Sequence, residues 1–211
     1  MERLRFILSL FLGAACLFLN SCASQQLDAH QSKILVSVED QTMVLSQHGQ
    51  PVKAYKISTS KFGLGDTPHS MRTPLGKMKV AKKIGGNQPK GAVFKGRRPT
   101  GEVLPPNAPG RDPIVTRIMW LKGTERRNKN AFHRYIYIHG TPEERTIGEA
   151  ASYGCIRMRS QDIVDLYSRI GVNAEVKVVE ESLMKLPTAF KQRSFVKSIE
   201  KQEVVKPEQN A

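Results

Sequence analysis

Hydrophobic and polar residues alternate over short stretches in the first third of this chain, which is the pattern of β-strands. Three such runs lie between residues 33 and 59, separated by a polar break and by the His48-Gly49 turn. Their alternating apolar positions are Ile34, Val36 and Val38, then Met43 and Leu45, then the run from Val52 to Ile57. Short runs joined by tight turns predict a three-stranded meander.

The middle of the chain predicts further strands. Thr73-Pro74-Leu75-Gly76 has the composition of a turn and leads into a strand that reaches Val80. Residues 114–121 and 135–139 also have strand patterns, and the second run is apolar at nearly every position. A strand that is apolar on both faces is expected to be central and buried. Trp120 and Met119 are expected to pack in the core, with a position along a substrate groove as the alternative.

After Met158 the apolar period changes to that of a helix. Ser160 is a candidate N-cap with Asp162 in the first turn, and Gly171 stands where the helix should end. The apolar face consists of Ile163, Val164, Leu166, Tyr167 and Ile170. Residues 174–179 predict a closing strand. From residue 181 to 211 the chain carries charges of both signs and few apolar residues, which predicts a surface helix followed by a disordered end.

The N-terminus has the features of an export signal. A short basic start is followed by fourteen apolar residues, Phe6 to Leu19, too few for a helix that crosses a membrane. Leu19-Asn20-Ser21-Cys22 resembles a bacterial lipobox. We therefore expect residues 1–21 to be a lipoprotein signal, Cys22 to carry lipid, and residues 22–32 to be a polar tether. Ordinary cleavage nearby, with Cys22 incidental, is the alternative.

This assignment leaves one free thiol. The sequence has three cysteines; Cys16 would leave with the signal and Cys22 would be acylated. Cys155 would then be the sole free cysteine in an exported, oxidising compartment, where a lone thiol usually has a use. The alternative is a small buried hydrophobic residue, which is how free cysteine commonly behaves. The neighbours Gly154 and Arg157 suit a buried apolar site poorly.

Positive charge is concentrated in the middle of the chain. The formal net charge is +14, and residues 71–134 hold sixteen Lys or Arg against three acidic residues. Such a field favours anionic envelope partners: phosphate-bearing polymers, acidic lipid head groups or peptide carboxylates. A solvated basic face without a partner is the alternative, and an exported lipoprotein is not expected to bind nucleic acid.

Glycine and proline are dense within that basic stretch. Residues 85–113 hold six Gly and six Pro, half of all prolines in the chain. The flanking segments look too small to fold alone, so we expect a long lid or binding loop within one domain, not a domain linker. Its cations are Lys90, Lys95, Arg97, Arg98 and Arg111.

The strongest chemical signal is a histidine and a cysteine sixteen positions apart. His139-Gly140-Thr141 closes the apolar run, and Ser152-Tyr153-Gly154-Cys155-Ile156-Arg157 precedes the predicted helix. A thiol with a nearby imidazole is the minimum equipment of a cysteine nucleophile with its own base. The other histidines, His30, His48, His69 and His133, show no ligand spacing, so we expect neither a metal nor another cofactor.

Together with the Thr73-Pro74-x-Gly76 turn, these two motifs resemble the YkuD-type L,D-transpeptidase catalytic domain over residues 33–180. The resemblance implies a mainly β, sandwich- or barrel-like fold with one helix after the cysteine and a long Pro/Gly-rich loop. It makes Cys155 the nucleophile, His139 its base and the Gly140 carbonyl the group that orients the imidazole.

The resemblance also gives the turn before the cysteine a function. Backbone N–H groups of Gly154 and Cys155 would hold the oxyanion, and a glycine at 154 suits a backbone conformation or close approach that a Cβ would obstruct. Ser152 would fix the turn or contact substrate. Arg157 would bind a substrate carboxylate or, as we favour, pair with a structural acid such as Asp162. Tyr153 departs from the family, which usually has histidine there.

The substrate class follows from the resemblance alone. A peptidoglycan tetrapeptide stem would be attacked at its third carbonyl, releasing D-alanine, and an amine acceptor would resolve the thioester. Two alternatives remain open: L,D-carboxypeptidase activity with water as acceptor, and a lipid-anchored wall-binding module whose site has decayed. The expected location is the cell envelope, anchored in the membrane and facing the periplasm, in the outer membrane if the organism has two membranes.

Overall fold

The alternating runs of the first third form three antiparallel strands, as predicted. The computed structural model describes residues 32–185, which begin with β1 (Ser32–Ser37), β2 (Thr42–Gln47) and β3 (Gln50–Lys56). β1 and β2 pair with Ile34 opposite Leu45 and Val36 opposite Met43. All four of these side chains are buried, so the alternation directs one face of the meander into the core.

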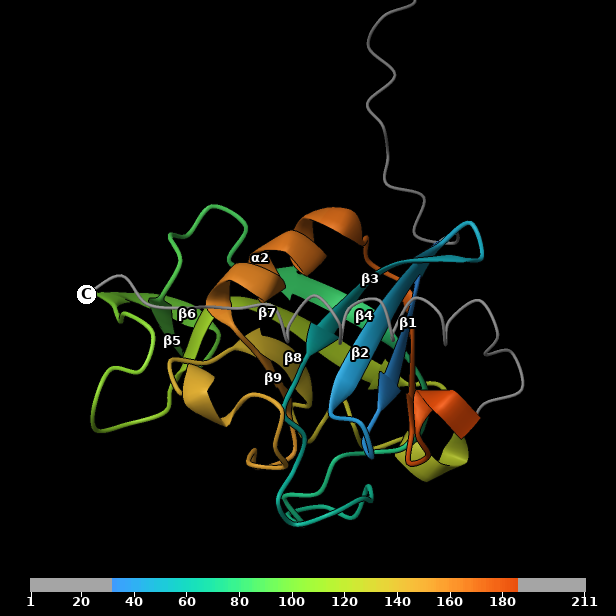
Figure 1. The fold of residues 1–211 in the computed structure, drawn as a ribbon. Helices are drawn as coiled ribbons and strands as arrows, with labels where there is room; N and C mark the ends of the chain where they lie inside the picture. The colour runs from blue at the N-terminus through green and yellow to red at the C-terminus, as the bar shows by residue number, and fades with distance from the viewer. Residues whose placement is uncertain (1–31, 186–211) are drawn as a thin grey trace, which may run out of the picture.

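One mixed sheet contains all the described strands (Figure 1). Its order is β3-β2-β1-β10-β4-β7-β5-β6, and β8 pairs with β7 and β9. Only β1–β10 and β8–β9 are parallel among these pairs. The remaining bounds are β4 (Gly76–Ile84), β5 (Ala92–Lys95), β6 (Arg98–Val103), β7 (Ile114–Gly123), β8 (Tyr137–Gly140), β9 (Ile156–Met158) and β10 (Glu175–Val179). The predicted mainly β fold is thus confirmed, with one α-helix among residues 32–185.

The predicted helix is α2 (Ser160–Arg169), and its apolar face packs against β7 and β8. Ile163 and Leu166 are fully buried, as is Ile170 just beyond the helix. The sequence suggested Ser160 as the N-cap of this helix, which is wrong, because the N-cap is Arg159. The Ser160 N–H donates at 2.8 Å to the Glu144 carboxylate. That carboxylate comes from a distant turn, η3 (Glu144–Thr146), so local sequence gave no sign of it.

The glycine- and proline-rich stretch is not one long loop. It contains the β5–β6 hairpin, and β5 joins the sheet by pairing with β7. Ala92, Val93 and Phe94 are buried, which anchors the hairpin. Pro99 is tolerated because β6 is an edge strand that needs few donors. The hairpin lies at the opposite end of the sheet from the β1–β3 meander (Figure 1).

The described residues continue past β10 to Lys185. The short helix η4 (Leu183–Lys185) follows, and Leu183 packs on Val44. The Leu183 N–H donates at 2.7 Å to Asp40.

A second short helix, η2 (Arg126–Asn128), follows β7. The expected signal, Cys22, most of the tether and residues 186–211 lie outside the described residues. No helix within residues 32–185 has the length and apolar character needed to cross a membrane.

Candidate active site

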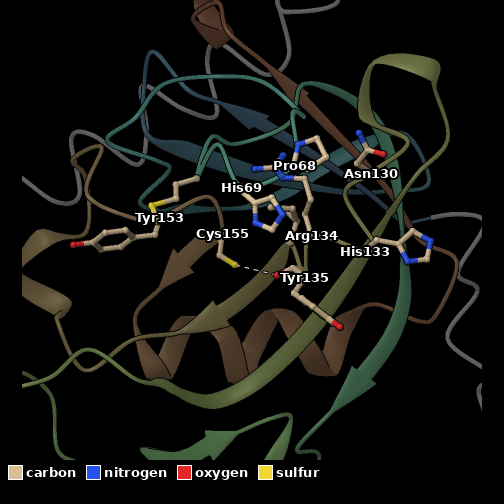
Figure 2. Close-up of a pocket in the computed structure, with 10 residues that line it drawn as sticks. Pro68, His69, Asn130, His133, Arg134, Tyr135, Tyr153 and Cys155 are labelled. Atoms are coloured by element: carbon tan, nitrogen blue, oxygen red, sulfur yellow. Dashed lines mark hydrogen bonds between the residues drawn. The ribbon is translucent and has the colours of Figure 1, made fainter.

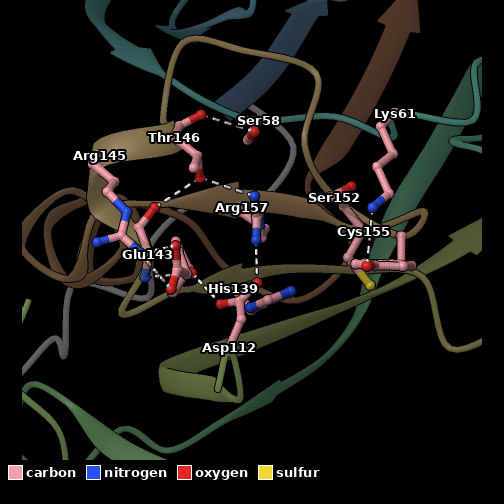
Figure 3. Close-up of polar contacts among 12 residues, drawn as sticks. Ser58, Lys61, Asp112, His139, Glu143, Arg145, Thr146, Ser152, Cys155 and Arg157 are labelled. Carbon is pink, nitrogen blue, oxygen red and sulfur yellow. Dashed lines mark hydrogen bonds and ion pairs between the residues drawn. The ribbon is translucent and has the colours of Figure 1, made fainter. Parts of the chain in front are cut away.

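Parallel pairing of β8 with β9 brings the predicted histidine and cysteine to one face of the sheet. His139 stands opposite Arg157, and Cys155 precedes β9 by one residue. Side chains alternate along a strand, so Cys155 and Arg157 point to the same side, which is the side of His139. In Figure 3 His139 is drawn below Arg157, with the Cys155 sulfur to one side of both. Residues far apart in sequence thus share one site through strand register.

The His139 ring is buried and held in one tautomer. Its Nδ1 lies 2.8 Å from the Gly140 carbonyl oxygen. A carbonyl can only accept, so Nδ1 carries the proton and Nε2 is left with a free lone pair. Burial lowers the pKa of His139 to about 4, although the bond to Gly140 opposes that shift. The imidazole is therefore neutral near pH 7 and can accept a proton.

Gly140 contributes more than its carbonyl. A Cβ built at this position would lie 2.7 Å from the Val115 carbonyl oxygen and 3.0 Å from the Thr116 Cβ. β7 has an irregular register between Val115 and Ile118, where Thr116 adopts a positive φ of 72°. This irregular segment presses against Gly140, and sequence reasoning missed the requirement because any residue can supply a carbonyl.

The Cys155 thiol is bounded by backbone groups of the strand beside it. The Tyr137 N–H donates to Sγ at 3.4 Å, and the thiol donates to the Tyr135 carbonyl, also at 3.4 Å. Burial of the sulfur by the surrounding protein raises the pKa of Cys155 to about 11, partly offset by the Tyr137 N–H. None of the hydrogen bonds within residues 32–185 joins Sγ to His139. Thiol and imidazole are therefore both neutral at rest.

The turn before Cys155 is fixed by side-chain bonds. Gly154 has φ of +117°, a conformation that favours glycine, as the sequence suggested. Buried Ser152 donates through Oγ to the Cys155 carbonyl and accepts the Gly154 N–H at 3.3 Å. Ser152 therefore caps the turn. The Gly154 N–H, one candidate for the oxyanion, is occupied by that contact, whereas no described hydrogen bond uses the Cys155 N–H.

Thr73 supports the same turn from the opposite side. Its hydroxyl donates to the Gly154 carbonyl at 3.1 Å and accepts the Ser60 N–H at 3.0 Å. Thr73 is fully buried. The sequence predicted the Thr73-Pro74-x-Gly76 motif as a turn that enters a strand and as part of the family resemblance. Its contact with a turn about eighty residues later has no local signal.

Arg157 is buried and makes structural contacts. Its guanidinium pairs with Asp112 and donates at 3.0 Å to the Thr146 hydroxyl (Figure 3). Asp112 also accepts from Thr141, so the pair joins the segment after β8 to the end of the Pro/Gly-rich stretch. The expected acid was Asp162, which is wrong: Asp162 lies on α2, and strand register directs Arg157 to Asp112 instead.

A groove of about 520 Å³ opens at the thiol (Figure 2). The residues that line the groove with Cys155 include His69, Met71, His133, Arg134, Tyr135 and Tyr153. Arg134 fixes one wall, since its guanidinium bonds to Asp66 at 3.0 Å and to the Arg72 carbonyl at 2.8 Å. Cys155 lines the groove, and His139 is not among the residues that line it.

Tyr153 stands at the rim of the groove where the family usually has histidine. Tyr153 is 60% exposed, and its ring is directed away from the sulfur (Figure 2). Lys61 Nζ donates to the Tyr153 hydroxyl at 3.0 Å, and the centroids of the Phe62 and Tyr153 rings lie 5.6 Å apart.

Trp120 and Met119 are both buried, as favoured by the sequence. Cys155 packs against the apolar cluster that contains Trp120.

Comparison with known proteins assigns the chain to a family. A family model described as the L,D-transpeptidase catalytic domain, YkuD, matches residues 31–178. The chain therefore belongs to the YkuD family of L,D-transpeptidase catalytic domains. A Bacillus subtilis (strain 168) protein named as an L,D-transpeptidase, YqjB, is 32% identical over 64 residues, which are 30% of this chain and 36% of that protein.

Solved structures of L,D-transpeptidases resemble the chain more distantly. L,D-transpeptidase 3 of Mycobacterium tuberculosis, in complex with a faropenem-derived adduct, has 18% identity and a TM-score of 0.47 over 72% of this chain and 60% of its own. An Enterococcus faecium L,D-transpeptidase has 18% identity and a TM-score of 0.46 over 71% and 50%. The matched part of the chain thus spans about a third of the curated relative and half or more of these structures.

Proposed function

We propose that the chain is a cysteine-dependent L,D-transpeptidase acting on peptidoglycan stem peptides. The observation that carries this proposal is the β8–β9 register, which places the neutral His139 on the same face as a thiol that opens into a groove. Membership of the YkuD family supplies the substrate class. His139, Gly154 and Cys155 are all retained, which disfavours a decayed wall-binding module.

In the first half-reaction Cys155 Sγ attacks the carbonyl carbon of the third stem residue while its proton passes to His139 Nε2. The neutral resting pair favours transfer during attack over a preformed ion pair, because burial disfavours both charged forms. The Cys155 N–H would hold the oxyanion, joined by the Gly154 N–H if it releases Ser152. Collapse breaks the C–N bond, and His139 returns the proton to the leaving D-alanine amine.

In the second half-reaction an amine of another stem attacks the thioester carbonyl. Its proton passes to His139 Nε2 and then to the departing sulfur, which restores the neutral pair. Water in place of the amine would make the same site an L,D-carboxypeptidase. We further propose that the domain works in the cell envelope, tethered through a lipidated Cys22, facing the periplasm and, in an organism with two membranes, on the outer membrane.

Incubation of the soluble domain with purified disaccharide-tetrapeptides, followed by mass spectrometry, tests the proposal. We expect cross-linked dimers together with released D-alanine, and loss of both in Cys155→Ala. Tripeptide products without dimers would favour the carboxypeptidase. An unchanged substrate pool with the parent protein, together with retained binding to sacculi, would favour the wall-binding module and overturn the assignment.

A further inference from the structure

The Pro/Gly-rich hairpin brings one arginine to the aromatic residues beside the thiol. Arg97 lies at the β5–β6 turn, and its guanidinium carbon is 4.9 Å from the Trp120 ring and 5.0 Å from the Tyr135 ring. Its Nη1 donates to the Tyr137 hydroxyl at 3.4 Å. Tyr135 lines the groove, and the Tyr137 N–H contacts the sulfur. This cation, distant from Cys155 in sequence, therefore lies beside the candidate site.

The backbone conformation of this turn is unfavourable for residues other than glycine. Gly96 and Arg97 have φ of +58° and +67° between the paired Lys95 and Arg98, the conformation of a two-residue hairpin turn with both φ positive. Glycine is preferred at the second position of such turns because other residues are strained there. The chain instead places an arginine at Arg97, where its planar guanidinium rests on two aromatic rings.

Positive charge at this place lacks a counter-ion in the described part of the chain. Lys82 Nζ also approaches the Trp120 ring, at 5.6 Å, and neither Arg97 nor Lys82 takes part in any ion pair within residues 32–185. A guanidinium has five N–H donors, and only the bond to Tyr137 is formed among these residues. Two cations with unused donors lie on the Trp120 ring, and one of them also stacks on Tyr135, which lines the groove; this arrangement suits an anion.

We propose that Arg97 binds a free carboxylate of the donor stem peptide, next to the bond that is cleaved. The inference rests on the proposed function, which brings a peptide to Cys155. A carboxylate matches the planar fork of arginine and receives two parallel hydrogen bonds from it. Stacking on Trp120 and Tyr135 fixes the guanidinium before the peptide arrives, so little side-chain freedom is lost on binding. Arg97 is thus a positioning and specificity residue that acts on the substrate without touching the reacting atoms.

Binding without turnover separates this inference from the proposed function. The dissociation constants of three tetrapeptides for Cys155→Ala are measured by calorimetry: the free acid, the terminal carboxamide and the side-chain carboxamide. We expect one amidation to weaken binding at least about tenfold, as loss of a charged hydrogen bond predicts. The amidation that does so identifies which carboxylate is bound. In Cys155→Ala/Arg97→Gln, the free acid should bind as weakly as that amide.

Two matched variants make the result specific. Arg98→Gln in the same background removes an exposed cation of the same turn and should retain the discrimination. Arg97→Lys keeps the charge without the planar guanidinium and should retain only part of the discrimination between the free acid and the amides.

Equal weakening of the binding of all three peptides by Arg97→Gln would mean that Arg97 only holds the hairpin in place and would overturn the inference. Loss of discrimination in Lys61→Gln instead would assign the carboxylate to the Lys61–Tyr153 pair. Absence of turnover by the parent protein would contradict the proposed function without changing these binding results.

Discussion

Burial moves the proton affinities of Cys155 and His139 in opposite directions. With a thiol pKa of about 11, only about one molecule in ten thousand is a thiolate at pH 7. With a pKa of about 4, nearly all His139 is neutral there. The sequence predicted a cysteine nucleophile with its own imidazole base. The structure favours a base that removes the proton as the bond to carbon forms.

Alkylation by iodoacetamide tests this arrangement. The rate for the parent protein should keep rising with pH from 7 toward 11, because the raised pKa delays ionisation. His139→Ala should react about tenfold more slowly near pH 7, where the base assists, and approach the parent at high pH. His133→Ala, which removes another groove imidazole, should behave like the parent. A parent rate that levels off below pH 8, or equal rates for His139→Ala throughout, would contradict the account.

The lowered pKa of His139 also makes the stability of the domain depend on pH. The unfolded chain binds a proton at this histidine below pH 6.5, while the native state does not until about pH 4. Stability from His139 is therefore complete above pH 6.5 and is lost as the pH falls toward 4, by up to about 3 kcal/mol. Urea unfolding at pH 7 and pH 4.5 should show a smaller difference for His139→Gln than for the parent. Exposed His133→Gln should keep the parent difference.

At the scale of elements, the segment of β7 around Thr116 and strand β8 position the base together. Gly140→Ala would place a Cβ against the Val115 carbonyl and Thr116, so we expect a loss of about 1–3 kcal/mol and a clear fall in turnover. Gly86→Ala is the control, because the nearest atom to its Cβ would be the Tyr167 hydroxyl oxygen, at an ordinary contact distance of 3.5 Å. An unchanged melting temperature and turnover in Gly140→Ala would show that β7 shifts to accommodate the added Cβ without disturbing His139, which would contradict this account.

The spacing of apolar residues predicted the elements whose pattern was regular. It could not predict which strands pair with one another or in what register. The β1–β3 meander, β7 and α2 followed from alternating or helical spacing, and Cys155 with His139 followed from their motifs. The β5–β6 hairpin was missed because glycine and proline interrupt its short strands, and its buried apolar residues form a run of only three, Ala92 to Phe94. The contacts of Thr73 with Gly154 and of Arg157 with Asp112 join distant segments, so only the folded sheet defines them.

At the scale of the whole molecule, the basic middle of the chain divides into two parts. Arg97 is half-buried beside the candidate site, whereas Lys90, Lys95 and Arg98 are exposed on the same segment. Replacing those three with glutamine should weaken binding to sacculi and flatten its salt dependence, since exposed charges are screened beyond about 8 Å at physiological ionic strength. Turnover of a small soluble muropeptide should change little.

A charge-matched control uses exposed lysines elsewhere. Glutamine at Lys33, Lys122 and Lys177 removes the same charge and should leave sacculus binding closer to that of the parent. Equal weakening by both triple variants would show that net charge alone, and not the hairpin, attracts the wall. Normal sacculus binding with lost soluble turnover in the hairpin variant would assign these cations to the active-site groove.

Intact-protein mass spectrometry of the acyl-enzyme tests the central claim most directly. The parent domain, mixed briefly with a disaccharide-tetrapeptide and quenched in acid, should gain the mass of the stem less D-alanine, and peptide mapping should place it on Cys155. Cys155→Ala should gain nothing while keeping the parent melting curve. Release of D-alanine by the alanine variant at the parent rate, or an adduct on any other residue, would contradict a thioester at Cys155.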